Sequence, residues 1–170
     1  TEFRYLATEE RVNHVIEKVE YFGHDGDRVK GLVFCSRNDE AKALSDAFNK
    51  RGYNTIALSG SNSQSEREAA VERLEMQCNV DEKGRPVSEQ ALDYIFTVDI
   101  FNEGVDIPQV NQVIMLRPTQ SAIVFVQQLG RGLRKADGKE YVVVLDFIGN
   151  YEKAGRAPFL LNGGACVGER

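Results

Sequence analysis

Residues 31–36 read GLVFCS, an unbroken apolar run that ends in a hydroxyl side chain. A run without polar alternation is typical of a strand buried on both faces. Asn38 then starts a helical pattern in which Leu44 and Phe48 share one face, and Gly52 stops that helix. This strand followed by a helix predicts the first unit of a parallel sheet, because parallel strands require a crossover connection.

Four further apolar runs follow the same design, at residues 54–59 (NTIALS), 94–98 (YIFTV), 112–116 (QVIML) and 140–147 (EYVVVLDF). Helical patterns separate most of them. Strands that are apolar throughout need cover on both sides. We therefore predict an α/β fold, with a parallel sheet of five or more strands and helices on both faces.

Apolar residues at helical spacing predict an N-terminal helix and another helix over residues 120–133. Ser63 and Glu66 form a capping-box pattern that opens a further helix. Residues 78–91 are polar and are interpreted as an insertion, with a turn at residues 83–86.

The composition is that of a soluble globular domain, with 170 residues, 42% hydrophobic and 28% charged. We expect residues 1–150 to form one domain and the Gly-rich residues 151–170 to form a tail leading toward a further region. No apolar run is long enough to cross a membrane, and no signal peptide is recognised. The sequence thus favours a cytoplasmic location without a membrane partner.

The net charge of −5 argues against nucleic-acid binding by overall charge alone. Residues 117–139, however, hold five basic residues and one acidic residue, and a local positive surface suits a specific phosphate site. The three cysteines are scattered, without zinc or disulfide spacing, so the sequence predicts no metal site and a reducing compartment.

Residues 127–134 read QQLGRGLR on the last predicted helix, so Arg131 and Arg134 lie three residues apart on one helical face. An always-charged, planar donor can stabilise negative charge on a transferring phosphoryl group. The alternative is that arginines near the end of a helix are solvated and interact only with its dipole.

Ligands of open parallel sheets bind at the carboxyl ends of the strands. Ser36 and Arg37 follow the first strand, where free N–H groups at a helix N-terminus suit a phosphate; the alternative there is that Asn38 simply caps the helix. Gln64 and Arg67 follow the second strand. Arg67 has two interpretations, a phosphate contact or a structural pair with an acid such as Glu103.

Thr97 ends the third strand and leads into a loop that contains Gly104 and Asp106. A threonine can donate to a phosphate, and a carboxylate beside glycine can hold a sugar hydroxyl. The alternative is a plain turn that stops at Pro108. We expect every candidate, including the arginines of residues 127–134, to lie at or just beyond a strand's carboxyl end.

Taken in order, GLVFCSR, a Gln-x-x-Arg stretch, TVDIFNEGVDIP and QQLGRGLR resemble the C-terminal RecA-like domain of superfamily II helicases and translocases, from about Thr8 to Tyr151. The resemblance implies that one set of residues contacts the nucleic-acid backbone, that a second set meets ATP, and that Arg134 is the arginine finger with Arg131 as its partner. The backbone set is Ser36, Arg37, Gln64, Arg67 and Thr97, and the ATP set is Gly104, Asp106, Gln127, Arg131 and Arg134.

Three positions depart from common members of that superfamily. Ser59 stands where many relatives carry histidine, and Glu103 and Gln127 stand where DEAD-box RNA helicases carry arginine and histidine. The motifs are more similar to those of UvrB-like and restriction-subunit-like DNA enzymes. The resemblance therefore implies a nucleic-acid partner that is DNA rather than RNA, single- or double-stranded.

The chain contains no G-x-x-x-x-G-K-[ST] loop and no D-E-A-D or D-E-x-H sequence. The resemblance thus implies a P-loop NTPase-like fold without its own P-loop. ATP and its Mg2+ would be held by an N-terminal RecA-like domain of the same protein, and the chain alone would not hydrolyse ATP. Two alternatives stay open: a non-catalytic RecA-like domain that binds a nucleotide or a protein, and a flavodoxin-like small-molecule enzyme.

Overall fold

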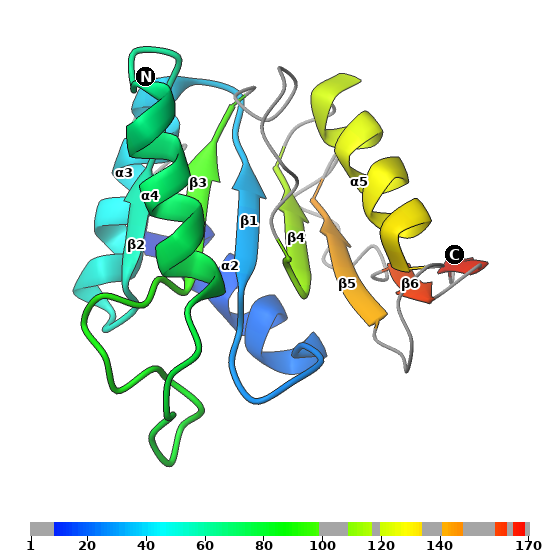
Figure 1. Ribbon diagram of the computed structural model, residues 1–170, viewed down its shortest axis with the longest axis horizontal. Coiled ribbons are helices and arrows are strands. Elements are labelled where there is room, and N and C mark those ends of the chain that lie inside the picture. The colour runs from blue at the N-terminus through cyan, green and yellow to red at the C-terminus, as the bar shows by residue number, and fades with distance from the viewer. Residues whose placement is uncertain are drawn as a thin grey trace.

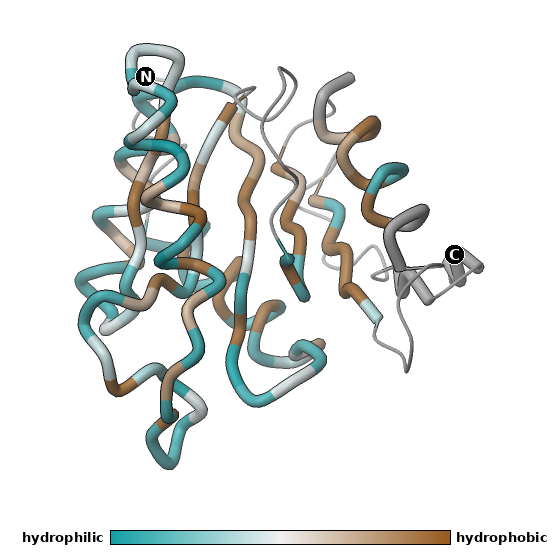
Figure 2. Tube along the Cα trace, viewed as in Figure 1, coloured by the Kyte–Doolittle hydropathy of each residue, from teal (hydrophilic) through white to brown (hydrophobic). Residues whose placement is uncertain are grey.

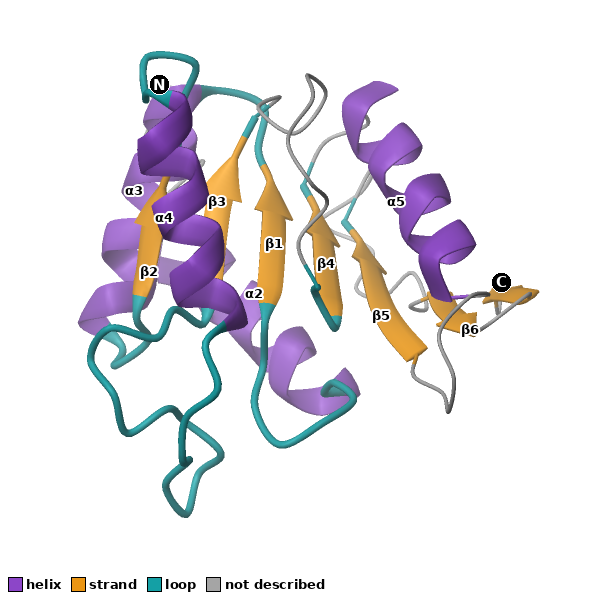
Figure 3. Ribbon diagram, viewed as in Figure 1, coloured by secondary structure: helices purple, strands orange, loops and turns teal. Residues whose placement is uncertain are grey.

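The computed structural model describes residues 9–98, 109–116, 120–133, 141–147, 159–162 and 165–168. Helices lie on both sides of a single sheet (Figures 1 and 3). The helices are α2 (Glu9–Phe22), α3 (Asn38–Lys50), α4 (Gln64–Glu75) and α5 (Gln120–Leu133). The strands are β1 (Gly31–Phe34), β2 (Thr55–Ala57), β3 (Tyr94–Thr97), β4 (Gln112–Met115), β5 (Tyr141–Asp146), β6 (Phe159–Asn162) and β7 (Ala165–Gly168).

The strand order is β2-β3-β1-β4-β5-β6-β7. The first five strands pair in parallel, which confirms the predicted parallel sheet. Strands β6 and β7 pair antiparallel and extend the sheet beyond β5. The sequence does not predict them, because two four-residue runs inside a Gly-rich stretch are too short to show a periodic pattern.

Successive residues of each central strand face opposite layers, as the pleat of a strand requires. On β1, Leu32 and Phe34 pack in the cluster that includes α4 and α5. Val33, together with Cys35 directly after the strand, packs in the cluster that includes α2 and α3. Figure 2 shows hydrophobic residues along these strands. Two apolar layers therefore enclose the sheet, as predicted.

Backbone hydrogen bonds continue past the carboxyl ends of the parallel strands and keep these ends aligned. The Cys35 N–H donates to the Thr97 carbonyl at 2.8 Å, and the Leu58 N–H donates to the Phe96 carbonyl at the same distance. The Leu116 N–H donates to the Phe34 carbonyl at 3.0 Å. Side chains that follow β1, β2 and β3 are consequently brought to one edge, called the carboxyl edge below.

Arg28 lies at the opposite edge and is buried, with 4% of its surface exposed. Its guanidinium donates to the carbonyls of Leu74 at 2.6 Å, Met76 at 2.7 Å and Leu92 at 2.9 Å. Leu74 and Met76 end α4, where the helix dipole favours a positive charge, and Leu92 precedes β3. The predicted insertion, residues 78–91, lies between these anchors, and its turn forms near Gly84, where φ is +75°.

None of the helices in the described part of the chain combines the length and apolar character needed to cross a bilayer.

We expect Arg28→Gln to lower the free energy of unfolding by about 3 kcal/mol, because three carbonyls, two of them on buried residues, lose a charged donor. Arg73→Gln is the matched control, since Arg73 donates from Nε to one carbonyl, that of Gln90, at 2.7 Å and is more exposed. Its loss is expected to be about 1 kcal/mol. Urea unfolding measures both values, and equal losses would contradict the assigned role of Arg28.

Candidate functional site

The turn between β1 and α3 carries Ser36 and Arg37. The Ser36 N–H donates to Glu40 Oε2 at 2.9 Å, and the Ser36 hydroxyl donates to the same oxygen. Arg37 is the N-cap of α3, with an extended backbone and no side-chain cap bond. Asn38 is therefore the first residue of the helix, and its interpretation as the cap is wrong. Sequence reasoning missed Glu40, because its only signal is its place in the first turn of the helix.

Arg37 projects into solvent from this turn. Its guanidinium pairs with Asp39 at 3.2 Å, and about half of each side chain is exposed, 53% and 44%. An exposed ion pair of this kind contributes at most about 1 kcal/mol. Arg37 can therefore exchange Asp39 for a more highly charged partner.

The first turn of α4 brings Gln64 and Arg67 to the same edge. The capping box is confirmed, since Ser63 accepts from the Glu66 N–H and Glu66 accepts from the Ser63 N–H. Gln64 is exposed and donates to Glu68 at 3.0 Å. Arg67 donates to the Gly60 carbonyl at 3.2 Å, while its Nε is buried and has no hydrogen-bond partner among the described residues.

Thr97 ends β3 and is fully buried. Its carbonyl accepts from Cys35, but Oγ1 makes no hydrogen bond to any described residue. Buried polar atoms are almost always paired, and an unpaired one costs roughly 1–3 kcal/mol. The carboxyl edge thus contains two buried polar atoms without partners in the described part of the chain, Thr97 Oγ1 and Arg67 Nε.

Helix α5 presents one face to the sheet and one to solvent. Ala122, Phe125 and Leu129 are buried in the core, whereas Gln127 is exposed and Ile123 is 43% exposed. Positions 123, 127 and 131 follow one another at helical spacing along the same side of the helix. The outer side of α5 therefore has an apolar residue beside the predicted ATP-facing glutamine.

The described part of the motif on α5, residues 127–133, does not lie at the carboxyl edge, so the expectation is wrong for these residues. Helix α5 starts beyond the end of β4 and returns across the sheet toward the start of β5 (Figure 1). Gln127 lies midway along the helix and Arg131 lies in its last turn. The Arg131 side chain and all of Gly104, Asp106 and Arg134 lie outside what the structure describes.

Cys35 lies behind the candidate site and is buried. Burial raises the pKa of its thiol well above the usual range, and the nearby Glu40 charge raises it further, while Arg11 opposes them. The thiol therefore stays protonated at neutral pH and is not a nucleophile. The described residues contain no group of three or more His, Cys, Asp or Glu side chains placed to hold a metal ion.

A cavity of about 390 Å³ lies at the edge opposite the candidate site, where β3 begins. Its polar lining is largely paired internally. Tyr53 donates to Glu20 at 3.1 Å, and Arg85 lies 4.6 Å from the centre of the Tyr53 ring. Burial and the Glu20 charge raise the pKa of Tyr53 to about 12. Burial also raises the pKa of Asp93, which accepts from the Asn54 N–H.

Comparison with known proteins finds one family match, the helicase conserved C-terminal domain, over residues 10–136. The chain is 26% identical over 145 residues to a putative ATP-dependent helicase, IRC3, of Saccharomyces cerevisiae, covering 85% of the chain and 19% of that protein. It is 32% identical over 124 residues to a putative mitochondrial ATP-dependent helicase of Schizosaccharomyces pombe, covering 73% and 18%. The chain thus spans about a fifth of these relatives.

A similar solved structure is domain 2 of the DEAD-box helicase Mss116p bound to an RNA duplex. The TM-score is 0.51 at 18% sequence identity, and the alignment covers 85% of this chain and 50% of that one. This similarity concerns the fold alone, and it agrees with the predicted RecA-like architecture.

The unpaired hydroxyl makes a specific prediction. Thr97→Val keeps the shape of the side chain and removes an unpaired polar group, so we expect the free energy of unfolding to rise by about 1 kcal/mol. Thr55→Val is the matched control, because Thr55 is also buried but its hydroxyl donates to the Ser45 carbonyl at 3.0 Å. That variant is expected to lose stability. Chemical denaturation measures both values. An equal loss of stability in the two variants would contradict the unpaired state of Thr97 Oγ1.

Proposed function

Because the chain belongs to the helicase conserved C-terminal domain family, we propose that it is the C-terminal motor domain of an ATP-dependent superfamily II helicase or translocase. The observation that carries this proposal is the family match over residues 10–136, which includes every candidate site residue. Both relatives described above are named as putative ATP-dependent helicases, and this supports an ATP-dependent helicase activity. Since the chain spans only about a fifth of those relatives, the activity belongs to the whole protein.

In this proposal ATP binds between two RecA-like domains. The N-terminal domain of the same protein holds the triphosphate and Mg2+, and this chain contributes Gln127, Arg131 and Arg134. The guanidinium of Arg134 stabilises charge on the γ-phosphoryl group, with Arg131 beside it. The exposed side of α5, with Ile123 next to Gln127, supports this arrangement, since it offers a surface on which a second domain can pack. Gly104 and Asp106 contact the ribose and phosphates.

Nucleic acid binds at the carboxyl edge, where the described structure collects Ser36, Arg37, Gln64, Arg67 and Thr97. Arg37 is the exposed cation of this set. The unpaired Thr97 Oγ1 and Arg67 Nε support the proposal, because both can be satisfied by groups that bind or close over this edge. Contacts to phosphates carry no sequence information, so binding is largely independent of sequence.

ATP binding and nucleic-acid binding are coupled because the cleft between the two RecA-like domains closes around ATP. Closure moves this domain as a rigid body against its partner, and the carboxyl edge then shifts along the nucleic-acid backbone. Hydrolysis and release reverse that shift.

The choice of DNA over RNA follows from the motif residues. Glu103 and Gln127 differ from the DEAD-box pattern, and this difference favours DNA. The solved neighbour with an RNA duplex is similar in fold only, at 18% identity, and does not bear on the substrate of this chain.

Arg134→Ala in the full-length protein tests the arginine finger. We expect nucleic-acid-stimulated ATP turnover to fall about a thousandfold, because charge on the transferring group loses its stabilising cation, while nucleic-acid binding is retained. Arg73→Ala, on the last turn of α4, is the control and should keep wild-type turnover. Unchanged turnover in Arg134→Ala would exclude the assignment and would favour a non-catalytic RecA-like domain.

Substrate choice is tested by titrating the full-length protein with DNA and RNA oligonucleotides of identical sequence. We expect DNA to stimulate ATP turnover at lower concentration, and we expect the affinity for both to fall as salt increases, because phosphate contacts release counterions. Half-maximal stimulation at a lower concentration of RNA would reverse the proposed preference.

A further inference from the structure

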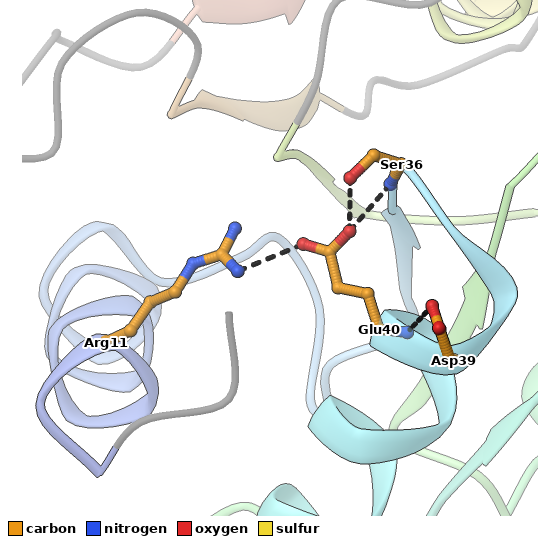
Figure 4. Close-up of polar contacts among 4 residues, drawn as sticks. All are labelled: Arg11, Ser36, Asp39 and Glu40. Carbon is orange, nitrogen blue, oxygen red and sulfur yellow. Dashed lines mark hydrogen bonds and ion pairs between the residues drawn. The ribbon is translucent and has the colours of Figure 1, made fainter. Parts of the chain in front are cut away.

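A buried ion pair lies directly behind the turn between β1 and α3. Figure 4 shows Arg11 reaching from α2 to Glu40 on α3, while the other oxygen of Glu40 faces Ser36. Arg11 Nη1 donates to Glu40 Oε1 at 3.0 Å, and the two side chains are only 5% and 1% exposed. The pair therefore connects the first described helix to the turn that carries Ser36 and Arg37.

Ser36 has two hydrogen-bond donors, its N–H and its hydroxyl, and both are directed to Glu40 Oε2. A phosphate oxygen is an acceptor and needs a donor from the protein. In this arrangement Ser36 has no donor left for a phosphate. The adjacent Arg37 guanidinium has several, and its present partner Asp39 is exposed and weakly held.

A buried ion pair contributes little net stability compared with apolar side chains of the same size, but it fixes geometry. The N-cap Arg37 makes no side-chain cap bond, and Asp39 Oδ1 accepts from the Glu40 N–H at 2.9 Å in the first turn of α3. The bonds from Ser36 to Glu40 tie the residue before the N-cap to that same turn. They hold the backbone that precedes Arg37. Arg11 also neutralises the carboxylate, and without it the buried negative charge would repel an approaching polyanion.

From this geometry we infer that Glu40, held by Arg11, is a positioning residue that fixes the turn so that Arg37, rather than Ser36, donates to the nucleic-acid phosphate. The inference rests on the proposed nucleic-acid contact at the carboxyl edge. It assigns Ser36 an internal role and makes the contribution of Arg37 dependent on two residues that do not touch nucleic acid.

The test compares Arg37→Gln, the double variant Arg11→Met/Glu40→Gln, and the triple variant that combines them, all in the full-length protein. The double variant removes both charges together, so that neither remains buried and unpaired. Binding of a single-stranded DNA oligonucleotide is measured over a range of salt concentrations. Nucleic-acid-stimulated ATP turnover is measured alongside.

We expect Arg37→Gln and the double variant each to weaken binding roughly tenfold, the loss of one charged hydrogen bond. Each should make the fall of log affinity with log salt concentration less steep by about 0.7, the value for one phosphate contact on a single strand. The triple variant should bind no more weakly than Arg37→Gln, because the two changes remove the same contact. The DNA concentration needed for half-maximal stimulation of ATP turnover should rise in all three variants.

Glu9→Gln is the matched control. Glu9 pairs with Arg51 at 2.9 Å and also links α2 to α3, but at the far end of α3. Breaking that pair should leave the affinity and the salt slope unchanged. A second variant, Ser36→Ala, removes only the hydroxyl and keeps the N–H bond to Glu40. Ser36→Ala should fold normally and weaken binding less than Arg37→Gln does. Combined with Arg37→Gln, it should cause no further loss of affinity. This comparison tests the inference even if the double variant does not fold.

Three results would overturn the inference. Wild-type affinity and salt slope in a folded double variant would show that Arg37 does not need the pair. Additive losses in the triple variant, or in Ser36→Ala combined with Arg37→Gln, would show that Ser36 or Glu40 acts independently of Arg37. If Arg37→Gln itself leaves the affinity and the salt slope unchanged, the proposed nucleic-acid contact of Arg37 fails together with the inference. The first two results, in contrast, overturn the positioning role of Glu40 while the contact of Arg37 stands.

Discussion

The parallel hydrogen-bond ladder is the constraint from which the rest of the site follows. Five strands run in one direction, and their backbone bonds continue past β1, β2 and β4 to hold the carboxyl ends level. Residues from distant parts of the sequence, such as Ser36, Arg67 and Thr97, reach one edge without any direct bond between their side chains being needed. The burial that drives this pairing comes from apolar residues on both faces of each strand.

The sequence alone predicts the five central strands of the sheet and the family to which the chain belongs. All five parallel strands were predicted, because an unbroken apolar run followed by a helical pattern strongly favours a strand buried between two layers. The capping box at Ser63 was equally predictable, since both partners lie within four residues. The family match confirms the resemblance, which rested on four motifs occurring in a fixed order.

What the sequence could not reveal depends on contacts between distant residues. Glu40 looks like an ordinary acidic residue in a helix's first turn until Arg11, 29 positions earlier, is placed beside it. The unpaired state of Thr97 Oγ1 is likewise invisible in a linear sequence. The parallel topology implies that α5 runs back from the carboxyl ends of the strands, so a motif in the second half of this helix does not lie at a strand end. The roles assigned to the ATP-facing residues remain predictions.

The bonds of Arg28 bear on how the domain can diversify. One guanidinium holds the carbonyls on both sides of the segment that joins α4 to β3, so the base of that segment is closed independently of its contents. Closing a longer loop costs little additional entropy. The length and sequence of residues 78–91 can therefore change while β3 keeps its alignment, which leaves the far end of the sheet open to new attachments.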